Sequence, residues 1–554
     1  MRKWLRQDSK HIPKAQLTGC FTPFSENSKQ RNGPSMKFFR KYHKWFSIVA
    51  TLFILCFAVS GIILNHREQL SGVDISRKLL PAVYRYNNWN LAAVKGSVTA
   101  GNDSVLVYGN IGVWLTDRNY RTFRDMNAGF PAGIDNRKIN TLCWSKSSGL
   151  YAGTLFGLFR FNGRVWEKVL LPVLRPRVVR VLQVGDSLLV MTRSNLYLST
   201  RAGAYRHFRE IEVPKGEDND GRVGLFKTLW VIHSGEIYGF TGKLIVDAIG
   251  IIFIILCITG LIYFFVPYRL RRLKDDRRRT NLKKFNRSSL KWHNVIGSWT
   301  ILILLVNTTA AIFLRPPLLI PIASARVAKI RFTELDNPNP WFDRFRDLLY
   351  DASSGRFLVA TSEGVYYSDD RFGSDLKVFA NQPPVSVMGI NVFEKCGPGS
   401  YLVGSFSGIY EWEPSTGRTL DCITRTDYVE TGQGGPPFGN VTVAGYIRCG
   451  DSSALIFDYA HGVISLEGKN TLPPFPEQIA AVSPVSLWNT CLEIHTGRIF
   501  EPILGPFYIL VVPLTGLATL FILVSGFFAW WLPRKKRKNR GIPAEKNVTS
   551  VTSG

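Results

Sequence analysis

Histidine is the residue type in this sequence that is best placed to do chemistry. The chain has eight histidines, and five of them flank long apolar stretches: His43, His66, His233, His293 and His495. Imidazole is a common axial ligand of haem iron in proteins that carry electrons. Ionisable side chains near membrane depth are costly and usually functional. These five histidines are therefore candidates for holding a cofactor.

Four of the five histidines belong to two motifs that each occur twice. Lys41-Tyr42-His43-Lys44-Trp45 precedes the first apolar stretch, and Lys291-Trp292-His293-Asn294 precedes the third. The pattern Ile-His-[Ser/Thr]-Gly-x-Ile begins at Ile232 and again at Ile494, ahead of the second and fourth stretches. The repetition indicates a duplicated chain in which His43 corresponds to His293 and His233 to His495. His66 aligns with Pro316 and has no counterpart.

The elements that must position these histidines are four membrane spans. Uncharged runs cover residues 45–64, 248–266 and 295–314, and a last run places a crossing near residues 513–532. About 20 apolar residues cross a bilayer as a helix. Two halves with the same orientation form a parallel repeat about an axis along the membrane normal. Facing helices of a four-helix bundle can each offer one ligand to a cofactor between them.

The distribution of charge predicts the orientation of the spans. The net charge is +28, and 29 of the 69 Lys and Arg residues but only five of the 41 acids lie in residues 1–44, 267–292 and 533–554. Loops rich in Lys and Arg stay in the cytoplasm. The basic excess is thus a signal of topology, and we expect no binding to nucleic acid. A 44-residue polar leader precedes the first apolar run, so we expect that run to remain as an anchor rather than as a cleaved signal peptide.

The predicted organisation alternates spans with external halves in a bacterial cytoplasmic (inner) membrane, with both termini cytoplasmic and the large domains periplasmic. Its parts are a cytoplasmic basic tail (1–44), a first span (45–65), an external half (66–243), a second span (244–266), a basic cytoplasmic loop (267–292), a third span (293–314), a second external half (315–494), a histidine motif with the fourth span (495–532) and a cytoplasmic basic tail (533–554).

The external halves show a repeated pattern of short strands. Similar segments begin at Ser104, Gly149, Ser187, Arg356, Ser400 and Ser453. A strand, a turn with glycine and a second strand every 40–45 residues or so are typical of propeller blades. We predict one β-rich, propeller-like domain of six to eight blades built from both halves. The alternative is two independent β-rich or α+β domains.

The predicted topology places His43 and His293 near the cytoplasmic face and His233 and His495 near the outer face. A symmetric arrangement would hold one bis-histidine haem b near each face, two in all, with metal ligation by these four residues. His66 either replaces one outer ligand or is a polar interface residue. For each histidine the alternative is an interfacial side chain bonded to backbone or to a lipid headgroup. Glycines in the spans would let a flat cofactor approach or would pack helices: Gly61, Gly250, Gly260, Gly297, Gly516 and Gly526.

These motifs together resemble the PepSY-associated transmembrane family. The similarity rests on the basic-x-His-x-Trp start, the first span that ends in Ser60-Gly61 and Asn65-His66, and the Ile-His-[Ser/Thr]-Gly-x-Ile motifs followed by spans with Thr259-Gly260 or Ser525-Gly526. The resemblance implies a membrane protein similar to siderophore-iron reductases, with haem held by transmembrane histidines. It implies electron flow from a quinol or a cytoplasmic reductase to a periplasmic ferric chelate or protein, and it supports His43, His233, His293 and His495 as ligands with His66 as a fifth. Outside the membrane the sequence departs from this pattern, because no PepSY α/β module is apparent.

Other classes of activity find no support in the motifs. The sequence has no P-loop and no dinucleotide-binding glycine motif. A ferric-chelate reductase would therefore need another electron source. Two alternatives remain open: a non-enzymatic receptor or assembly protein with a propeller as its binding platform, and a transporter built on the repeat. Only four spans, with no acid deep inside them, disfavour ion-coupled transport.

Overall fold

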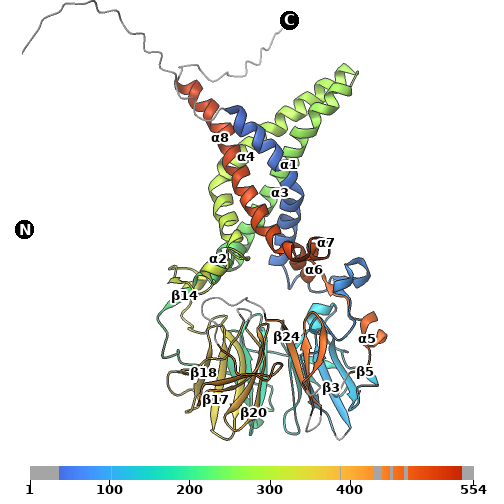
Figure 1. The fold of residues 1–554 in the computed structure, drawn as a ribbon, viewed down its shortest axis with the longest axis vertical. Coiled ribbons are helices and arrows are strands. Elements are labelled where there is room, and N and C mark those ends of the chain that lie inside the picture. Colours follow the sequence, from blue (N-terminus) through green and yellow to red (C-terminus); the bar gives the residue numbers. More distant parts are fainter. Residues whose placement is uncertain are drawn as a thin grey trace, which may run out of the picture.

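Four long helices form a bundle in the computed structural model, which describes residues 36–101, 103–386, 389–429, 439–449, 453–466 and 472–539. They are α1 (Met36–Asn65), α3 (Gly239–Arg272), α4 (Asp276–Ile312) and α8 (Val511–Asn539). Each is long and apolar enough to cross a membrane. Helix α1 contacts α3 and α8, and α4 contacts the same two helices. Figure 1 shows this bundle above a separate layer of strands.

The segment 267–292, predicted as a basic connection between the second and third spans, is almost entirely helical. Helix α3 continues to Arg272 and α4 begins at Asp276, so three residues connect them. Lys and Arg are good helix formers, and the side chain of Asp275 accepts hydrogen bonds from the amides of Arg277 and Arg278, which caps α4. The helices therefore extend beyond their apolar segments. Most of the predicted tails, residues 1–35 and 540–554, lies outside the described residues.

Short helices lie between the bundle and the strands. They are α2 (Leu225–Ser234), α6 (Leu487–His495) and α7 (Glu501–Leu504). Helix α5 (Glu477–Ala481) lies beside the strands instead, and its Ile479 packs in their core (Figure 1). Helix α2 packs on α4 and α6 packs on α1, as expected for equivalent parts of two halves. Before α8 the chain turns through α7 and short 3-10 helices at Arg498–Phe500 and Gly505–Leu510. The residues just before the predicted fourth crossing, up to Leu510, thus lie outside α8.

The strand layer consists of six antiparallel sheets, each built from consecutive strands. Their strands are β2 (Gly96–Thr99), β3 (Ser104–Gly109), β4 (Gly112–Asp117) and β5 (Phe123–Asp125); β6 (Ile139–Ser145), β7 (Gly149–Thr154), β8 (Leu158–Phe161) and β9 (Trp166–Val169); β10 (Val178–Val184), β11 (Ser187–Thr192), β12 (Leu196–Thr200) and β13 (Arg209–Ile211); β16 (Phe345–Asp351), β17 (Arg356–Thr361), β18 (Val365–Ser368) and β19 (Lys377–Val378); β20 (Ile390–Gly397), β21 (Ser400–Ser405), β22 (Gly408–Glu413) and β23 (Arg418–Asp421); and β24 (Val443–Cys449), β25 (Ser453–Asp458) and β26 (Gly462–Ser465). The six repeated segments of the sequence are the second strands of these sheets.

The first strands of the six sheets contact one another in cyclic order. Strand β2 contacts β6, and the series continues through β10, β16, β20 and β24 back to β2. Across the last contact the amide of Tyr446 donates a hydrogen bond to the carbonyl of Lys95. We call this arrangement the sheet ring. Three sheets come from each half of the chain.

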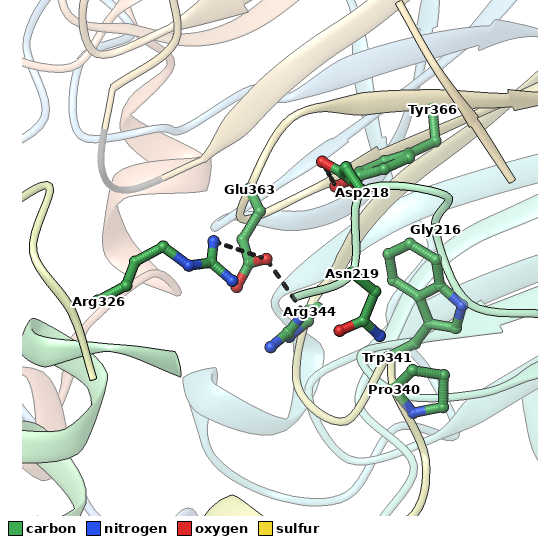
Figure 2. Close-up of a pocket in the computed structure, with 9 residues that line it drawn as sticks. All are labelled: Gly216, Asp218, Asn219, Arg326, Pro340, Trp341, Arg344, Glu363 and Tyr366. Atoms are coloured by element: carbon green, nitrogen blue, oxygen red, sulfur yellow. Dashed lines mark hydrogen bonds and ion pairs between the residues drawn. The ribbon is translucent and has the colours of Figure 1, made fainter. Parts of the chain in front are cut away.

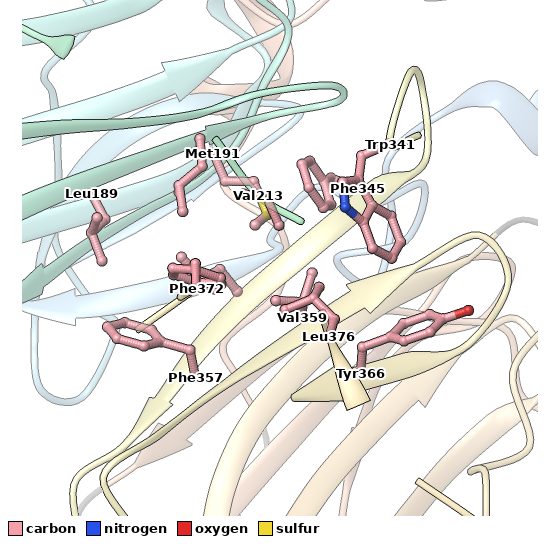
Figure 3. Packing of buried hydrophobic residues seen from close by; sticks show 12 residues of the cluster. Leu189, Met191, Val213, Trp341, Phe345, Phe357, Val359, Tyr366, Phe372 and Leu376 are labelled. Carbon is pink, nitrogen blue, oxygen red and sulfur yellow. The ribbon is translucent and has the colours of Figure 1, made fainter. Parts of the chain in front are cut away.

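Two apolar cores join the halves within the sheet ring. Figure 3 shows the core between the third and fourth sheets, where Leu189 and Met191 face Phe357 and Val359, with Trp341 and Phe345 beside them. The second core joins the first sheet to the sixth, with members on both sides. The halves therefore share their cores, which is not the arrangement expected of two independent domains.

Two small sheets also cross between the halves, next to the membrane helices. Strand β1 (Asp74–Ile75), which follows α1, pairs with β27 (Val485–Ser486), which precedes α6. Strand β14 (Arg222–Gly224), which precedes α2, pairs with β15 (Arg326–Ala328), which follows α4. Each pair joins one half to the other and ties α2 or α6 to the end of a long helix.

Candidate functional site

Four of the five predicted histidines meet in two pairs inside the helical region. The rings of His43 in α1 and His293 in α4 have centroids 6.3 Å apart. The rings of His233 at the end of α2 and His495 at the end of α6 have centroids 5.9 Å apart. We call the first the distal pair, because it is far from the sheet ring, and the second the proximal pair. Each pair contains one histidine from each half.

All four histidines are held through the same ring nitrogen. Nδ1 of His43 donates to the carbonyl of Ile522 at 3.0 Å, and Nδ1 of His495 donates to that of Phe57 at 3.0 Å. Nδ1 of His233 lies 3.4 Å from the carbonyl of Asn307. Nδ1 of His293 lies 2.9 Å from Oγ1 of Thr259. Every partner lies on a helix other than the one that carries the histidine, so contacts between helices fix the orientation of each ring.

The hydroxyl partners also settle where the proton lies. Oγ1 of Thr259 donates to the carbonyl of Ile255 at 2.6 Å, and Oγ of Ser60 donates to that of Cys56 at 2.6 Å. Because each hydroxyl donates its hydrogen to a carbonyl of its own helix, it accepts a hydrogen bond from Nδ1. Ser60 accepts this bond from His495 at 3.1 Å. A proton on Nδ1 leaves Nε2 with a free lone pair, which is the state of a histidine that binds metal.

Glycines pack directly against three of the four rings. A Cβ on Gly526 would lie 2.8 Å from Cε1 of His43, one on Gly61 would lie 3.1 Å from Cε1 of His495, and one on Gly260 would lie 3.7 Å from Cε1 of His293. Each follows the Ser or Thr that contacts the same histidine. The Ser-Gly and Thr-Gly motifs thus combine a hydroxyl anchor with room for the ring.

The other three glycines of the spans pack helices against each other. A Cβ on Gly516 would lie 2.2 Å from Ile312, one on Gly250 would lie 2.9 Å from Ile62, and one on Gly297 would lie 3.6 Å from Leu256. These glycines therefore serve the close approach of helices that small residues permit in membranes.

The spacing within each pair fits two imidazoles that share one metal ion. A metal about 2.1 Å from one nitrogen of each of two opposed imidazoles places the ring centroids roughly 6 Å apart. Both pairs have this spacing. Along α1, 14 residues separate His43 from Phe57, the contact of His495, which corresponds to about 21 Å between the pairs at the rise of an α-helix.

Burial of the proximal pair favours the neutral form of both rings. Burial, and after it the neighbouring His233, lowers the pKa of His495 to about 3. Burial also lowers the pKa of His233.

His66 does not join either pair. Its Nε2 lies 2.8 Å from Oδ2 of Asp247 in α3, and Asn65 donates to the other oxygen of the same carboxylate at 2.8 Å. Within the described part of the chain no ring contact links His66 to another histidine. The nitrogen that would bind iron is engaged by a carboxylate, so His66 fits the role of a polar residue at the helix interface.

Ser60, Thr259, Ser525 and Asn307 are the site residues that the sequence did not single out for contact with histidine. The first three stand in the Ser-Gly and Thr-Gly motifs. The signal was therefore present as a repeated hydroxyl before glycine. Asn307 shows no such motif, and the contact of its backbone carbonyl depends on how α2 packs on α4.

A separate polar depression lies at the fourth sheet, beside β14 and β15. Figure 2 shows Glu363 between the guanidinium groups of Arg326 and Arg344, with Tyr366 bonded to Asp218. Glu363 bridges both arginines, at 3.4 Å and 3.1 Å. The charges of this depression are satisfied among themselves. Groups of three or more His, Cys, Asp or Glu side chains fit to hold a metal do not occur among the described residues.

Comparisons with known proteins agree with the membrane part of the chain. The model of a family described as "PepSY-associated TM region" matches residues 15–266 and 193–533. Comparison with curated proteins gives no match.

Two solved structures share a weak likeness with the chain. The extracellular domain of the hybrid two component system BT4673 from B. thetaiotaomicron is 10% identical with a TM-score of 0.32, and the match covers 67% of this chain and 32% of that one. The corresponding domain of BT3049 from the same organism is 10% identical with a TM-score of 0.29, covering 68% and 40%. The chain spans less than half of the length of these neighbours.

Proposed function

Because this chain belongs to the PepSY-associated transmembrane family, and because its membrane histidines meet in two pairs, we propose that it is a haem b-containing electron-transfer protein. The observation that carries the proposal is the shared geometry of the four histidines, which meet in two pairs with Nδ1 of each ring anchored by a neighbouring helix. His43 and His293 would hold one haem, and His233 and His495 a second. A bound haem supplies one-electron redox chemistry.

The residues of the chain have distinct parts in this function. The four imidazoles bind and orient, while Ser60, Thr259, Ser525 and the backbone carbonyls keep the proton on Nδ1. Packing of Gly61, Gly260 and Gly526 against the rings prevents them from turning away. Two sites about 21 Å apart along α1 divide a hydrocarbon core of about 30 Å into shorter steps.

The proposed orientation has both termini in the cytoplasm and the sheet ring in the periplasm of a bacterial inner membrane. The basic segments at the end of the bundle away from the sheet ring support it, since Lys and Arg are retained in the cytoplasm. Electrons would enter from a quinol or a cytoplasmic reductase and leave to a periplasmic acceptor such as a ferric siderophore. The protein would then act as a ferric-chelate reductase with lipid as its only constant partner.

We further infer that the sheet ring is a six-bladed β-propeller. The support is the cyclic order of contacts among the six first strands and the pair of apolar cores that join the two halves. A ring built from both halves would hold the proximal pair above a fixed platform.

The test of this function is an absorption spectrum of the purified full chain produced with haem available. We expect a b-type reduced-minus-oxidised spectrum and two haems per chain. His43→Ala or His293→Ala should remove about half of the haem, and so should His233→Ala or His495→Ala, because each haem depends on its own pair. His207→Ala, at an exposed position of the strand layer, is the control and should keep both. A colourless protein, or full haem in all four variants, would reject the proposal.

A second candidate function is a receptor or assembly protein without a cofactor. The sheet ring favours it, because such platforms commonly bind other molecules and a fold does not fix a function. A colourless protein that retains a stable external partner would support this reading. The absorption spectrum described above distinguishes the two functions.

A further inference from the structure

The first strands of the sheet ring carry an irregularity at one equivalent position. In five sheets the pairing of the first strand with the second skips a residue, and in the first sheet Lys95 stands at the corresponding place before β2. The skipped residues are Asn140, Val179, Arg346, Asn391 and Ala444. A bulged residue is released from the ladder and its side chain is re-aimed.

These side chains reach from one sheet to the next. Nζ of Lys95 donates to Oδ1 of Asn140 at 2.9 Å, and Nδ2 of Asn140 donates to the carbonyl of Val178 at 2.9 Å. In the other half Nδ2 of Asn391 donates to the carbonyl of Val443 at 2.9 Å. The bulge positions therefore line the inner side of the sheet ring.

The duplication places two cations opposite each other. Lys95 in the first sheet corresponds to Arg346 in the fourth, as Asn140 in the second corresponds to Asn391 in the fifth. Equivalent positions three sheets apart in a cycle of six lie on opposite sides of its centre. Lys138 and Arg177 precede the first strands of the second and third sheets and add two more cations. We call Lys95, Lys138, Arg177 and Arg346 the basic centre.

Most of this charge has no acid to balance it. Lys138 pairs with Asp135, which also binds Arg67. For Lys95, Arg177 and Arg346 no carboxylate lies within 4.0 Å in the part of the chain that the structure describes. The nearby acids Asp347 and Glu394 are engaged by Arg180, at 3.5 Å and 3.3 Å. Asp343, whose charge raises the pKa of Arg177 and Arg346, is engaged by Arg193 and Lys227.

The cations of the basic centre act on one another. Burial, and then the charges of Lys138, Arg177 and Arg67, lowers the pKa of Lys95 to about 7. Burial and Arg193 lower the pKa of Arg346 to about 9. Positive groups that are held close enough to lower one another's pKa indicate a binding place for a negatively charged ligand.

Lys138 of the basic centre lies on the side of the sheet ring that faces the membrane helices. Arg67, which binds the partner of Lys138, follows α1 directly and stacks on Trp488 of α6 at 3.6 Å. A cavity between α6 and the sheet ring is lined by Arg77, Lys138, Asn489 and Glu493. Glu493, which lines this cavity together with Lys138, stands two residues before His495 of the proximal pair.

We propose that the basic centre binds a small polyanionic metal chelate, such as a polycarboxylate complex of ferric iron. This inference rests on the proposed function for the identity of the ligand. Two cations on opposite sides suit a ligand with several negative groups, and charge-assisted hydrogen bonds make such contacts strong. The ligand would be held at the inner side of the sheet ring.

The test is binding of gallium(III) citrate to the full chain in neutral detergent, measured by calorimetry. Gallium replaces iron because it is not reduced, so binding is separated from electron transfer. Lys95→Gln with Arg346→Gln should weaken binding at least about tenfold, since hydrogen bonds to charged groups contribute more than about 1.4 kcal/mol each. Arg164→Gln with Lys168→Gln, two exposed cations on the second sheet, is the matched control and should bind as the unchanged chain does.

Further arms separate the remaining outcomes. Equal affinity of the two double variants, or no binding by the unchanged chain, would overturn the proposal. Loss of binding in nanodiscs that contain phosphatidylglycerol, but not in phosphatidylcholine alone, would assign the basic centre to a lipid headgroup instead. His43→Ala protein should still bind gallium citrate. The binding result therefore stands or fails independently of the haem spectrum.

Discussion

At the scale of single residues, the histidine sites depend on small neighbours as much as on the ligands. A glycine and a hydroxyl from an adjacent helix fix three of the four rings, and a backbone carbonyl contributes to the fourth. Contacts within the protein therefore set the orientation and tautomer of each ring, and in the proposed function this reduces the ordering required when haem binds.

Gly526→Ala tests this dependence at one position. The added Cβ would lie 2.8 Å from Cε1 and 3.1 Å from Nδ1 of His43, so the ring must move. We expect about half of the haem to be lost, with the proximal site intact, when haem is measured by its reduced-minus-oxidised spectrum. Gly297→Ala, whose Cβ would make an ordinary 3.6 Å contact with Leu256, should keep both haems. Equal haem content in the two variants would contradict the role assigned to Gly526.

At the scale of elements, ion pairs fasten the helical region to the sheet ring. Asp343, just before β16, binds Lys227 of α2 at 2.7 Å and Arg193 at 2.9 Å. On the other side Asp135 binds Arg67, which follows α1. These contacts fix α2 and the end of α1 relative to the sheets, and α2 carries His233.

Asp343→Asn should destabilise the protein by about 1–3 kcal/mol at pH 7, because two charged donors lose their partner. Burial alone would raise the pKa of Asp343, but Arg193 and Lys227 lower it overall. Its stabilising contribution is therefore present above the ordinary aspartate pKa of about 3.9 and is lost as the pH falls below it.

The measurement is the thermal midpoint of the detergent-solubilised chain at pH 7 and at pH 3. The difference between Asp343→Asn and the unchanged chain should shrink at pH 3. Asp427→Asn removes an exposed pair with Arg418 and should change neither midpoint noticeably. A difference that is the same at both pH values would show that the charge of Asp343 is not what stabilises this contact.

At the scale of the whole molecule, neither half is complete. Each histidine pair takes one residue from each half, and both cores that close the sheet ring contain residues of both. The halves are connected covalently by only three residues, Leu273–Asp275.

Residues 1–274 and 275–554 produced as two chains should therefore assemble when made together. We expect co-purification through a tag on one chain, with haem in the complex, because the contacts that join the halves do not depend on the link. Either chain alone should lack haem and aggregate, since it exposes two apolar cores. A stable single half with one haem would show that the halves function separately.

The sequence by itself determined the spans, the duplication, the pairing of the four histidines and the positions of the repeated strands. These features follow from local composition and from motifs that recur at matching places, so they need no knowledge of distant contacts. His66 and the connection between α3 and α4 show the limit of such reasoning. The sequence does not distinguish a histidine beside a span that binds metal from one that binds a carboxylate. Nor does it distinguish a basic segment that forms a loop from one that forms a helix.

Only the tertiary structure decided which atoms complete the sites. The anchors of Nδ1 and the partner of His66 each join residues tens to hundreds of positions apart. Such contacts depend on how helices and sheets pack, and packing is a property of all the residues at an interface.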